Sequence, residues 1–337
     1  MNSNPAKVQA GLTLVELMVA MAIGMLLILA VSNIFLAQRQ AYRVNENLAH
    51  MQDSGRTAFE LMARELREAG GNACGTTRIG NVVNGASGSI WLDWERGGVE
   101  GFDGGQDMPG VSTGTEAAER VAGTDALVLR SASLNEGVII TDHQTTSAQF
   151  KVNTTAHGFV PGDIVMACDY RQAAILQITN ASSSNSTIVH NTGAGTPGNC
   201  SKGLGFPTDC DSVVGNEYSF EGNGFLNRLT TSAWFIGNND HGGRSLFRIV
   251  NDGAAQEIAE GVADMQLEYL TRTGSSPASD YVDAMSVDDW ANDASSLVIG
   301  VRVTLQVESR QNVGVDAGRL SRRIVHVVSL RHREIVQ

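Results

Sequence analysis

The chain has 337 residues, a formal net charge of −12 and only three lysines. Such an acidic balance lacks the basic patches that bind phosphate backbones, so nucleic acid is not an expected partner. The length suffices for one long helix and a sizeable domain, and we expect one head domain rather than two.

An apolar stretch that begins at Gly11 organises the chain. It follows a short polar leader, 1–10, whose only charged side chain is Lys7, a residue that indicates the cytoplasmic side. From Leu17 to Gln38 the 22 residues carry no charge. A helix of that length would reach about 33 Å, across a hydrocarbon core of about 30 Å. The sequence therefore predicts one membrane span over about residues 14–38.

Glu16 is the one charge at the start of this span. An acidic side chain in hydrocarbon costs about 2.5–3.5 kcal/mol. One interpretation places Glu16 at the headgroup level, in the first turn of the helix, where the helix dipole favours it. The other is that the chain is cut between Gly11 and Leu12, so that Glu16 pairs with the new α-ammonium of Leu12 in its own or a neighbouring subunit.

The leader, Gly11, the segment 13–17 and the long apolar run together resemble the class III signal of type IV pilins and of type II secretion pseudopilins. The resemblance implies that prepilin peptidase cuts after Gly11, that the new amine of Leu12 is methylated, and that Glu16 guides docking into a filament. Phenylalanine usually follows the glycine in that family, so Leu12 leaves the efficiency of methylation open. Because the cut precedes the apolar run, the helix would be retained, unlike the apolar region of a secretory signal peptide.

The helical pattern continues beyond Arg39 and Arg43, with apolar residues spaced by three and four up to Met62. On the solvent-facing side of the helix, Glu60 would pair with Arg64 and Arg64 with Glu68. The two glycines at 70–71 would end the helix. We expect one helix over 12–69. A coiled-coil stalk is the alternative, but the repeat is short and poor in leucine.

Beyond Gly71 the chain changes to short β-rich runs separated by loops. Predicted strands cover 126–130, 138–141, 163–168, 174–179, 232–236, 246–250, 265–270, 297–307 and 324–330. In the run 297–307 apolar residues alternate with polar ones, the pattern of a strand with one buried face. The second half of the helix would cover that face. The expected fold is α+β and pilin-like, a long N-terminal helix packed on a mostly antiparallel sheet in a head of residues 70–337. We expect the loop-rich segments 80–123 and 181–215 to be surface excursions.

Four later segments resemble PilW-type minor pilins: 123–130, 162–166, 260–269 and 328–333. This resemblance implies a low-copy subunit that primes pilus assembly with other minor pilins and sits at the pilus tip, in many systems under a large adhesin. It implies a single pass through the inner membrane with a periplasmic head, followed by transfer into the pilus. The implied partners are prepilin peptidase, other minor pilins, the major pilin and a tip adhesin. A J-type minor pseudopilin of a type II secretion system is the alternative within the class.

The four cysteines, Cys74, Cys168, Cys200 and Cys210, all fall in the part expected outside the cytoplasm, where disulfides persist. Four cysteines allow three connectivities. We expect Cys200 to pair with Cys210, closing a short loop, and Cys74 to pair with Cys168, tying the end of the helix to the sheet. Free thiols and a zinc site are the alternatives, but no CxxC or HxxxH spacing supports zinc.

Motifs of catalysis are scarce. The segment 193–198 matches GxGxxG by letter, but it contains Pro197 and no helix pattern follows it. Walker A and HExxH motifs are missing from the sequence, and the seven histidines show no ligand spacing. Acidic loops at 103–107, 238–240 and 288–289 could hold calcium, yet none follows the EF-hand order, and we expect them to be solvated. We therefore expect no enzyme, no cofactor and no metal; a signal-anchored periplasmic protein is the alternative class of function.

Overall fold

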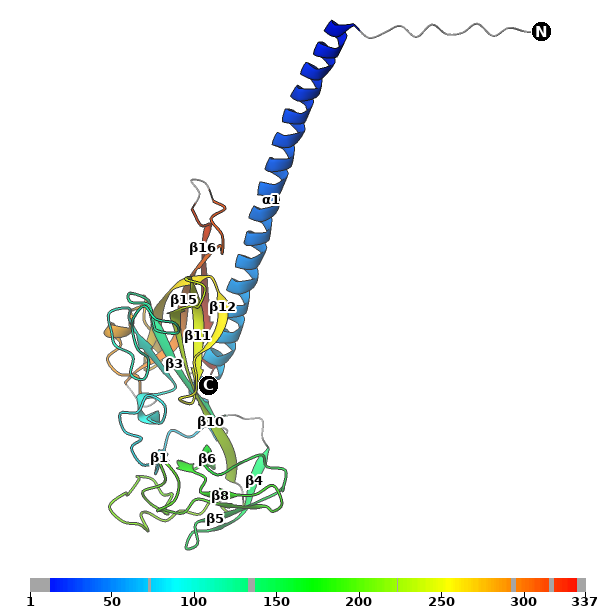
Figure 1. Cartoon of the computed structure of the whole chain (residues 1–337). Coiled ribbons are helices and arrows are strands. Elements are labelled where there is room, and N and C mark those ends of the chain that lie inside the picture. Colours follow the sequence, from blue (N-terminus) through cyan, green and yellow to red (C-terminus); the bar gives the residue numbers. More distant parts are fainter. Residues whose placement is uncertain are drawn as a thin grey trace, which may run out of the picture. The chain divides into compact units, whose positions relative to one another are not determined.

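The computed structural model of the chain describes residues 13–71, 74–132, 137–222, 224–291, 295–314 and 318–331 (Figure 1). It is an α+β protein in which a long N-terminal apolar helix precedes a mostly antiparallel β-sheet head, as the sequence predicted. The helical elements are α1 (Leu14–Glu68) and the 3₁₀ helices η1 (Trp94–Arg96) and η2 (Ala284–Ser286). The strands are β1 (Ile79–Asn81), β2 (Val99–Phe102), β3 (Ala126–Ala132), β4 (Val138–Gln144), β5 (Gln149–Val152), β6 (Ile164–Cys168), β7 (Ala173–Gln177), β8 (Asn180–Ala181), β9 (Thr187–Val189), β10 (Gly224–Asn238), β11 (Arg244–Val250), β12 (Gln256–Glu260), β13 (Val262–Thr273), β14 (Ser276–Pro277), β15 (Ser296–Glu308) and β16 (Ser321–Ser329).

Helix α1 runs for 55 residues, a length of about 82 Å at 1.5 Å per residue. It ends at Glu68, one residue before the predicted end, because Gly70 adopts a left-handed φ of 73° and its amide donates to the carbonyl oxygen of Arg130 at 2.8 Å. Side-chain pairs along its wet face join Arg56 to Glu60 and Arg64 to Glu68. Glu60 thus pairs one turn earlier than expected, and each exposed pair contributes only a few tenths of a kcal/mol.

The chain forms two compact units. One takes in the chain up to His50 together with Ser309–Leu320, and the other takes in Met51–Glu308 together with the chain from Ser321. Within the first unit, the Nδ2 of Asn47 donates to the carbonyl oxygen of Arg43 at 2.9 Å, and the Oδ1 of Asn47 accepts the amide of Gln311 at 3.2 Å. The guanidinium of Arg43 donates to the Oε1 of Gln311, so the loop between β15 and β16 is fastened to the helix.

Strand β10 joins the two halves of the larger sheet of the second unit (Figure 1). Its first residues, 224–228, pair with β4 and β6, whereas 229–238 pair with β3 and β11. We call β1, β4–β9 and the first part of β10 the insert lobe. We call β2, β3, the second part of β10, β11–β16 and the last turns of α1 the helix lobe. The helix lobe also contains the four-stranded sheet in the order β14-β13-β15-β16.

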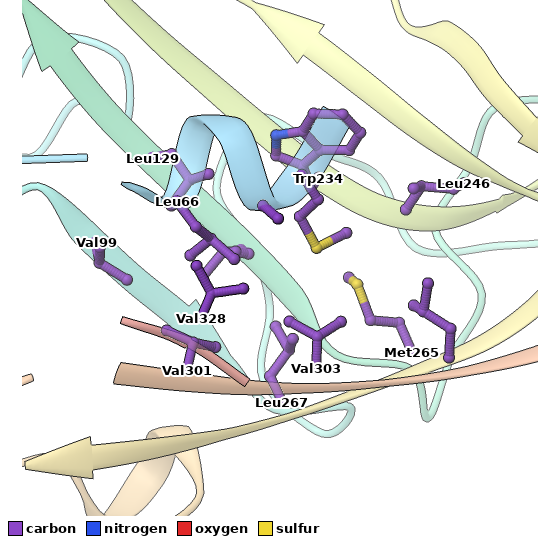
Figure 2. Packing of buried hydrophobic residues seen from close by; sticks show 14 of the residues in the cluster. Leu66, Val99, Leu129, Trp234, Leu246, Met265, Leu267, Val301, Val303 and Val328 are labelled. Carbon is purple, nitrogen blue, oxygen red and sulfur yellow. The ribbon is translucent and has the colours of Figure 1, made fainter. Parts of the chain in front are cut away.

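The main core of the helix lobe joins α1 to both of its sheets (Figure 2). Ala58, Met62 and Leu66 from α1 lie fully buried against Val301 and Val303 of β15. The prediction that the second half of the helix covers the apolar face of this strand is therefore confirmed. Trp234 of β10, Met265 and Leu267 of β13 and Val328 of β16 complete the packing that Figure 2 shows.

The expectation that 80–123 is a surface excursion is wrong. Its strand β2 pairs with β3 and is buried throughout, and Ile90, Phe102 and Met108 form a second core with Phe235. The reason lies in β3, whose alternate residues enter different cores: one set faces α1, and the other would face water if this segment did not cover it. Because glycines and polar residues separate its buried positions, the burial of this segment could not be recognised from the sequence.

Candidate functional site

The first candidate site is the exposed apolar half of α1. Every large hydrophobic side chain from Leu14 to Leu36 is more than half exposed. Judged by length and composition, α1 is able to cross a membrane. Apolar surface of this extent on a folded chain needs lipid or other apolar helices to cover it.

Thr13 and Glu16 begin α1 as a capping box. The Oε2 of Glu16 accepts the amide of Thr13 at 3.0 Å and the hydroxyl of Thr13 at 3.1 Å. In return the Oγ1 of Thr13 accepts the amide of Glu16 at 3.3 Å. The spacing T-x-x-E is visible in the sequence, so this role could have been found there. Among the described residues, the Oε1 of Glu16 accepts no hydrogen bond, which leaves that oxygen open for a second partner.

Gly11 and Leu12, the predicted cleavage and methylation positions, lie outside the described residues. The predicted pairing of Glu16 with the α-ammonium of Leu12 therefore stays a prediction. The capping box adds a local reason for the same carboxylate, because it satisfies amide groups that the first turn of a helix leaves without partners.

Glu65 fastens the end of α1 to β10 and β11. Its Oε2 accepts the hydroxyl of Ser232 at 2.6 Å and the indole Nε1 of Trp234 at 2.8 Å. Its Oε1 pairs with the guanidinium of Arg248, whose Cζ lies 5.6 Å from the centroid of the Trp234 ring. Three donors on β10 and β11 thus converge on one carboxylate of the helix. Nothing in the sequence distinguishes Glu65 from the charged residues of the wet face.

Close packing fastens the same helix to β15 and β16. A side chain at Gly55 would place its Cβ 2.5 Å from the Cδ1 of Ile324 and 3.4 Å from the Cγ2 of Val307. One turn on, the ring of Phe59 stacks on His326 with the centroids 3.8 Å apart. Glycine at position 55 therefore lets the helix approach the sheet more closely than any other residue would allow.

The structure has two disulfides, Cys74–Cys168 and Cys200–Cys210, which is the pairing named above. Their Cα atoms lie 6.0 Å and 5.2 Å apart. The first joins the segment just after α1 to β6 of the insert lobe. The second closes a loop of the insert lobe, in which the chain is otherwise short of regular structure.

Two histidines that are 47 residues apart meet inside the insert lobe. The Nε2 atoms of His143 and His190 lie 3.2 Å apart, and both rings are buried, next to Phe150. Burial lowers the pKa of His143 to about 4, against the field of Asp142, which raises it. Burial, reinforced by the neighbouring His143, lowers the pKa of His190 to about 3. Both imidazoles are therefore neutral at pH 7.

The described residues contain no group of three or more histidine, cysteine or acidic side chains placed to hold a metal ion. In one of the acidic loops, Asp103 has a structural role: its carboxylate accepts the amides of Ala284 and Met285 at 3.0 Å and 2.8 Å. These bonds fix the start of η2, so the expectation of a merely solvated loop is wrong for this residue.

Two segments of the chain match known families. Residues 6–32 match the Prokaryotic N-terminal methylation motif, and residues 233–326 match Type IV Pilus-assembly protein W (PilW). Neither a curated protein nor a solved structure matches the chain. The methylation motif, the exposed apolar helix and the helix-covered antiparallel sheet define a type IV pilus-associated, pilin-like protein with a class III signal.

Within that class, the family that the chain matches is PilW, and the matched residues run from the second part of β10 into β16. They form most of the helix lobe. The insert lobe lies outside the matched segment, which begins in the second part of β10.

Proposed function

We propose that this chain is a minor pilin of a type IV pilus, cut after Gly11 and methylated at Leu12, which primes pilus assembly and sits at or near the tip. The observation that carries the proposal is the continuity of α1. One helix begins inside the matched methylation motif and ends in the core of the sheet that matches PilW. A filament subunit requires one helix of this kind, with an exposed apolar first half and a second half packed in the head.

The exposed apolar half of α1 would lie in two apolar environments in turn. Before assembly, the exposed apolar half would span the inner membrane, with the head in the periplasm. After assembly, the same surface would pack against the apolar helices of other minor pilins and of the major pilin. The hydrogen bonds of Glu65 and the close packing at Gly55 keep the second half in the head throughout.

N-terminal mass spectrometry of the membrane-extracted protein tests the proposal. We expect the mature chain to begin at a methylated Leu12, and a Gly11→Val variant to keep the leader with Lys7 and to stay in the inner membrane. The reason is that the peptidase site needs a residue without a side chain before the cut. A wild-type protein that retains its leader would instead identify a signal-anchored periplasmic protein, and a Gly11→Val protein that still begins at Leu12 would refute this cleavage site.

The docking role of Glu16 needs a control for its capping role. Glutamine at the same position can still accept the amide of Thr13, because a capping box takes Glu or Gln, but it has no charge to pair with an α-ammonium. We therefore expect Glu16→Gln and Glu16→Ala to be cleaved normally, to reduce the number of surface pili and to co-purify less with other minor pilins. Thr13→Ala removes the cap and keeps the charge, so it should assemble nearly as wild type. Full assembly of Glu16→Gln together with failure of Thr13→Ala would assign the function to the cap alone.

The match to PilW favours a pilus over a type II secretion system, in which the corresponding subunit is a J-type pseudopilin. Deletion of the gene separates the two systems. We expect loss of surface pili with secretion unchanged; loss of secretion with normal pili would assign the chain to the secretion system.

A further inference from the structure

A pocket of about 580 Å³ lies at the end of α1 in the helix lobe. Its walls come from the last turns of α1 and from β3, β10 and β11. Side chains alternate along a strand, so Ser131 is on the same side of β3 as Leu129, which packs under α1. Likewise, Thr230 is on the same side of β10 as the buried Trp234. The helix ends at Glu68, and the pocket lies where this side of the sheet loses its cover.

Two ion pairs account for both carboxylates in the lining. The guanidinium of Arg248 pairs with Glu65, whose other oxygen accepts from β10. The Nε of Arg64 lies 3.5 Å from the Oε1 of Glu68, one turn further along α1. Each glutamate of the pocket is thus matched by one arginine, so an anion that entered would not meet an uncompensated carboxylate.

Two more arginines, Arg67 and Arg331, give the pocket an excess of two positive charges. Both are exposed, and neither guanidinium has a hydrogen-bond or ion-pair partner in the part of the chain that the structure describes. Ser131 and Thr230 are half-buried and lie directly opposite each other on β3 and β10. Their hydroxyl groups also have no partner among the described residues. Guanidinium and hydroxyl groups are common donors to phosphate oxygens.

The helix dipole explains only part of this arrangement. Arg67 lies in the last turn of α1, where a basic side chain is favourable without any ligand. Arg331 follows β16, at the other end of the sequence, and lines the same pocket. Two like charges in one pocket repel each other unless an anion lies with them. The chain as a whole has a net charge of −12, so this local positive excess runs against its composition.

We infer that this pocket binds the phosphate group of a phosphomonoester. Such a group carries a charge of about −1.5 to −2 at pH 7, which matches the excess of two arginines. A phosphodiester or a simple carboxylate carries only one negative charge. The volume is in the range of about 300–1,000 Å³ that is usual for small-molecule sites, so the organic part of the ester also fits, beside Leu61 and Ala132. The inference does not rest on the proposed function, because the pocket uses neither the exposed apolar half of α1 nor the N-terminal motif.

Calorimetric titration of the full chain in phosphatidylcholine nanodiscs tests the inference. The probe is glycerol 3-phosphate, and dimethyl phosphate and acetate are the singly charged comparisons. We expect saturable binding of glycerol 3-phosphate, at least about tenfold tighter than that of either comparison and weaker at higher salt. Absence of saturable binding, or equal affinity for dimethyl phosphate, would overturn the inference.

A second arm separates the two sources of a phosphomonoester. Phosphatidic acid carries the same group on a lipid, so vesicles that contain it are added to the protein before the titration. Displacement of glycerol 3-phosphate by these vesicles, but not by phosphatidylcholine vesicles, supports the site and identifies a lipid ligand. Unchanged binding of glycerol 3-phosphate supports the site and identifies a soluble ester.

Four variants locate the binding. Arg67→Gln and Arg331→Gln should each weaken it about tenfold, the size expected for one charged hydrogen bond. Thr230→Val removes a hydroxyl group without changing the charge and should weaken it about threefold. Arg323→Gln is the matched control, because Arg323 is an exposed arginine of β16 that does not line the pocket. Wild-type affinity in both pocket arginine variants, or an equal loss in Arg323→Gln, would refute the site.

Two further outcomes keep the test sharp. If urea unfolding shows that Arg67→Gln is destabilised through the helix dipole, Arg331→Gln and Thr230→Val decide the question: loss of affinity in both supports the site, and wild-type affinity in both refutes it. The chain after Arg331 has one acidic side chain, Glu334, which lies outside the described residues. Binding that appears only in Glu334→Gln would mean that the chain neutralises its own pocket, and would overturn the inference.

Discussion

The buried histidine pair makes the insert lobe sensitive to acid. His143 and His190 share one hydrogen bond between their Nε2 atoms, so one ring donates and the other accepts. The Nδ1 of His143 accepts the amide of Phe220 at 3.3 Å, and Phe150 packs on both rings. A proton added to either ring removes an acceptor and places a charge in an apolar core. We therefore expect protonation of the pair to open this lobe.

The direction of the two pKa shifts determines how the stability of the lobe changes with pH. Both folded-state pKa values lie below the ordinary value of 6.5, so the unfolded chain binds more protons at low pH. The contribution of the pair to stability is complete above pH 6.5 and is lost as the pH falls from there toward the folded values of about 4 and about 3. At pH 5 the contribution of each histidine to the free energy of unfolding has fallen by about 2 kcal/mol, which is about 4 kcal/mol for the pair. That is a large part of the about 5–15 kcal/mol that stabilises an ordinary domain.

Hydrogen exchange at pH 7.5 and pH 5.0, corrected for the intrinsic exchange rate at each pH, measures this loss lobe by lobe. We expect lower protection at pH 5.0 in β4, β5 and β9. The helix lobe provides an internal comparison, because burial raises the pKa of Asp125 to about 6. A raised carboxyl pKa has the opposite effect on stability, because Asp125 contributes more stability as the pH falls below 6. We therefore expect β13 to keep its protection at pH 5.0.

Two variants check the assignment. His190→Phe keeps a stacked ring and removes one titrating group, so it should reduce the acid sensitivity by about half, although it also leaves His143 without its partner. His241→Gln changes an exposed histidine and should behave as the wild type. Equal protection of the insert lobe at both pH values, or an acid response that His190→Phe leaves unchanged, would refute the reasoning.

Three further predictions concern how the head is held together, each measured by urea unfolding in nanodiscs. Glu65→Ala should destabilise the helix lobe by about 2–4 kcal/mol, because it leaves the donors of β10 and β11 unpaired. Glu65→Gln keeps an acceptor and should cost less than half of that. Equal effects of the two variants would show that the hydrogen bonds are unimportant. Gly55→Leu should cost about 1–3 kcal/mol through overpacking, and wild-type stability would mean that the helix can shift. Replacing the cysteines of Cys74–Cys168 by serine should cost about 4.7 kcal/mol by loop entropy, against about 2.7 kcal/mol for Cys200–Cys210, and the reverse order would contradict the entropic account.

Elements with strong periodicity could be predicted from the sequence. Strand β15 alternates buried and polar residues, and α1 has an apolar run followed by apolar residues spaced by three and four, so both followed from local pattern. Strand β2 could not be predicted, because its sequence, 99–102, contains a glutamate and a glycine. Its burial is imposed by pairing with β3 and by the buried pair of Glu100 with Arg130.

The contacts that form the candidate sites were harder to predict because they join residues distant in the sequence. Glu65 has the same local surroundings as the other charged residues of α1, and only the folded sheet brings Trp234 and Arg248 to it. His143 lies in β4 and His190 follows β9, so the two meet only when β5 pairs with both of these strands. The capping box of Thr13 and Glu16 is the exception, since its two residues are neighbours on one turn of helix.

The Cys74–Cys168 disulfide also determines how the head would carry mechanical load. A force that pulled α1 away from the insert lobe would act first on the chain that follows the helix. Without the disulfide, that chain would hold the insert lobe only through β1, which pairs with β7 over three residue pairs. With it, six residues after Glu68 a covalent bond leads directly to β6, so the tension bypasses this short ladder. Under oxidising conditions the insert lobe would thus stay attached to the end of α1 even if β1 were pulled off its sheet.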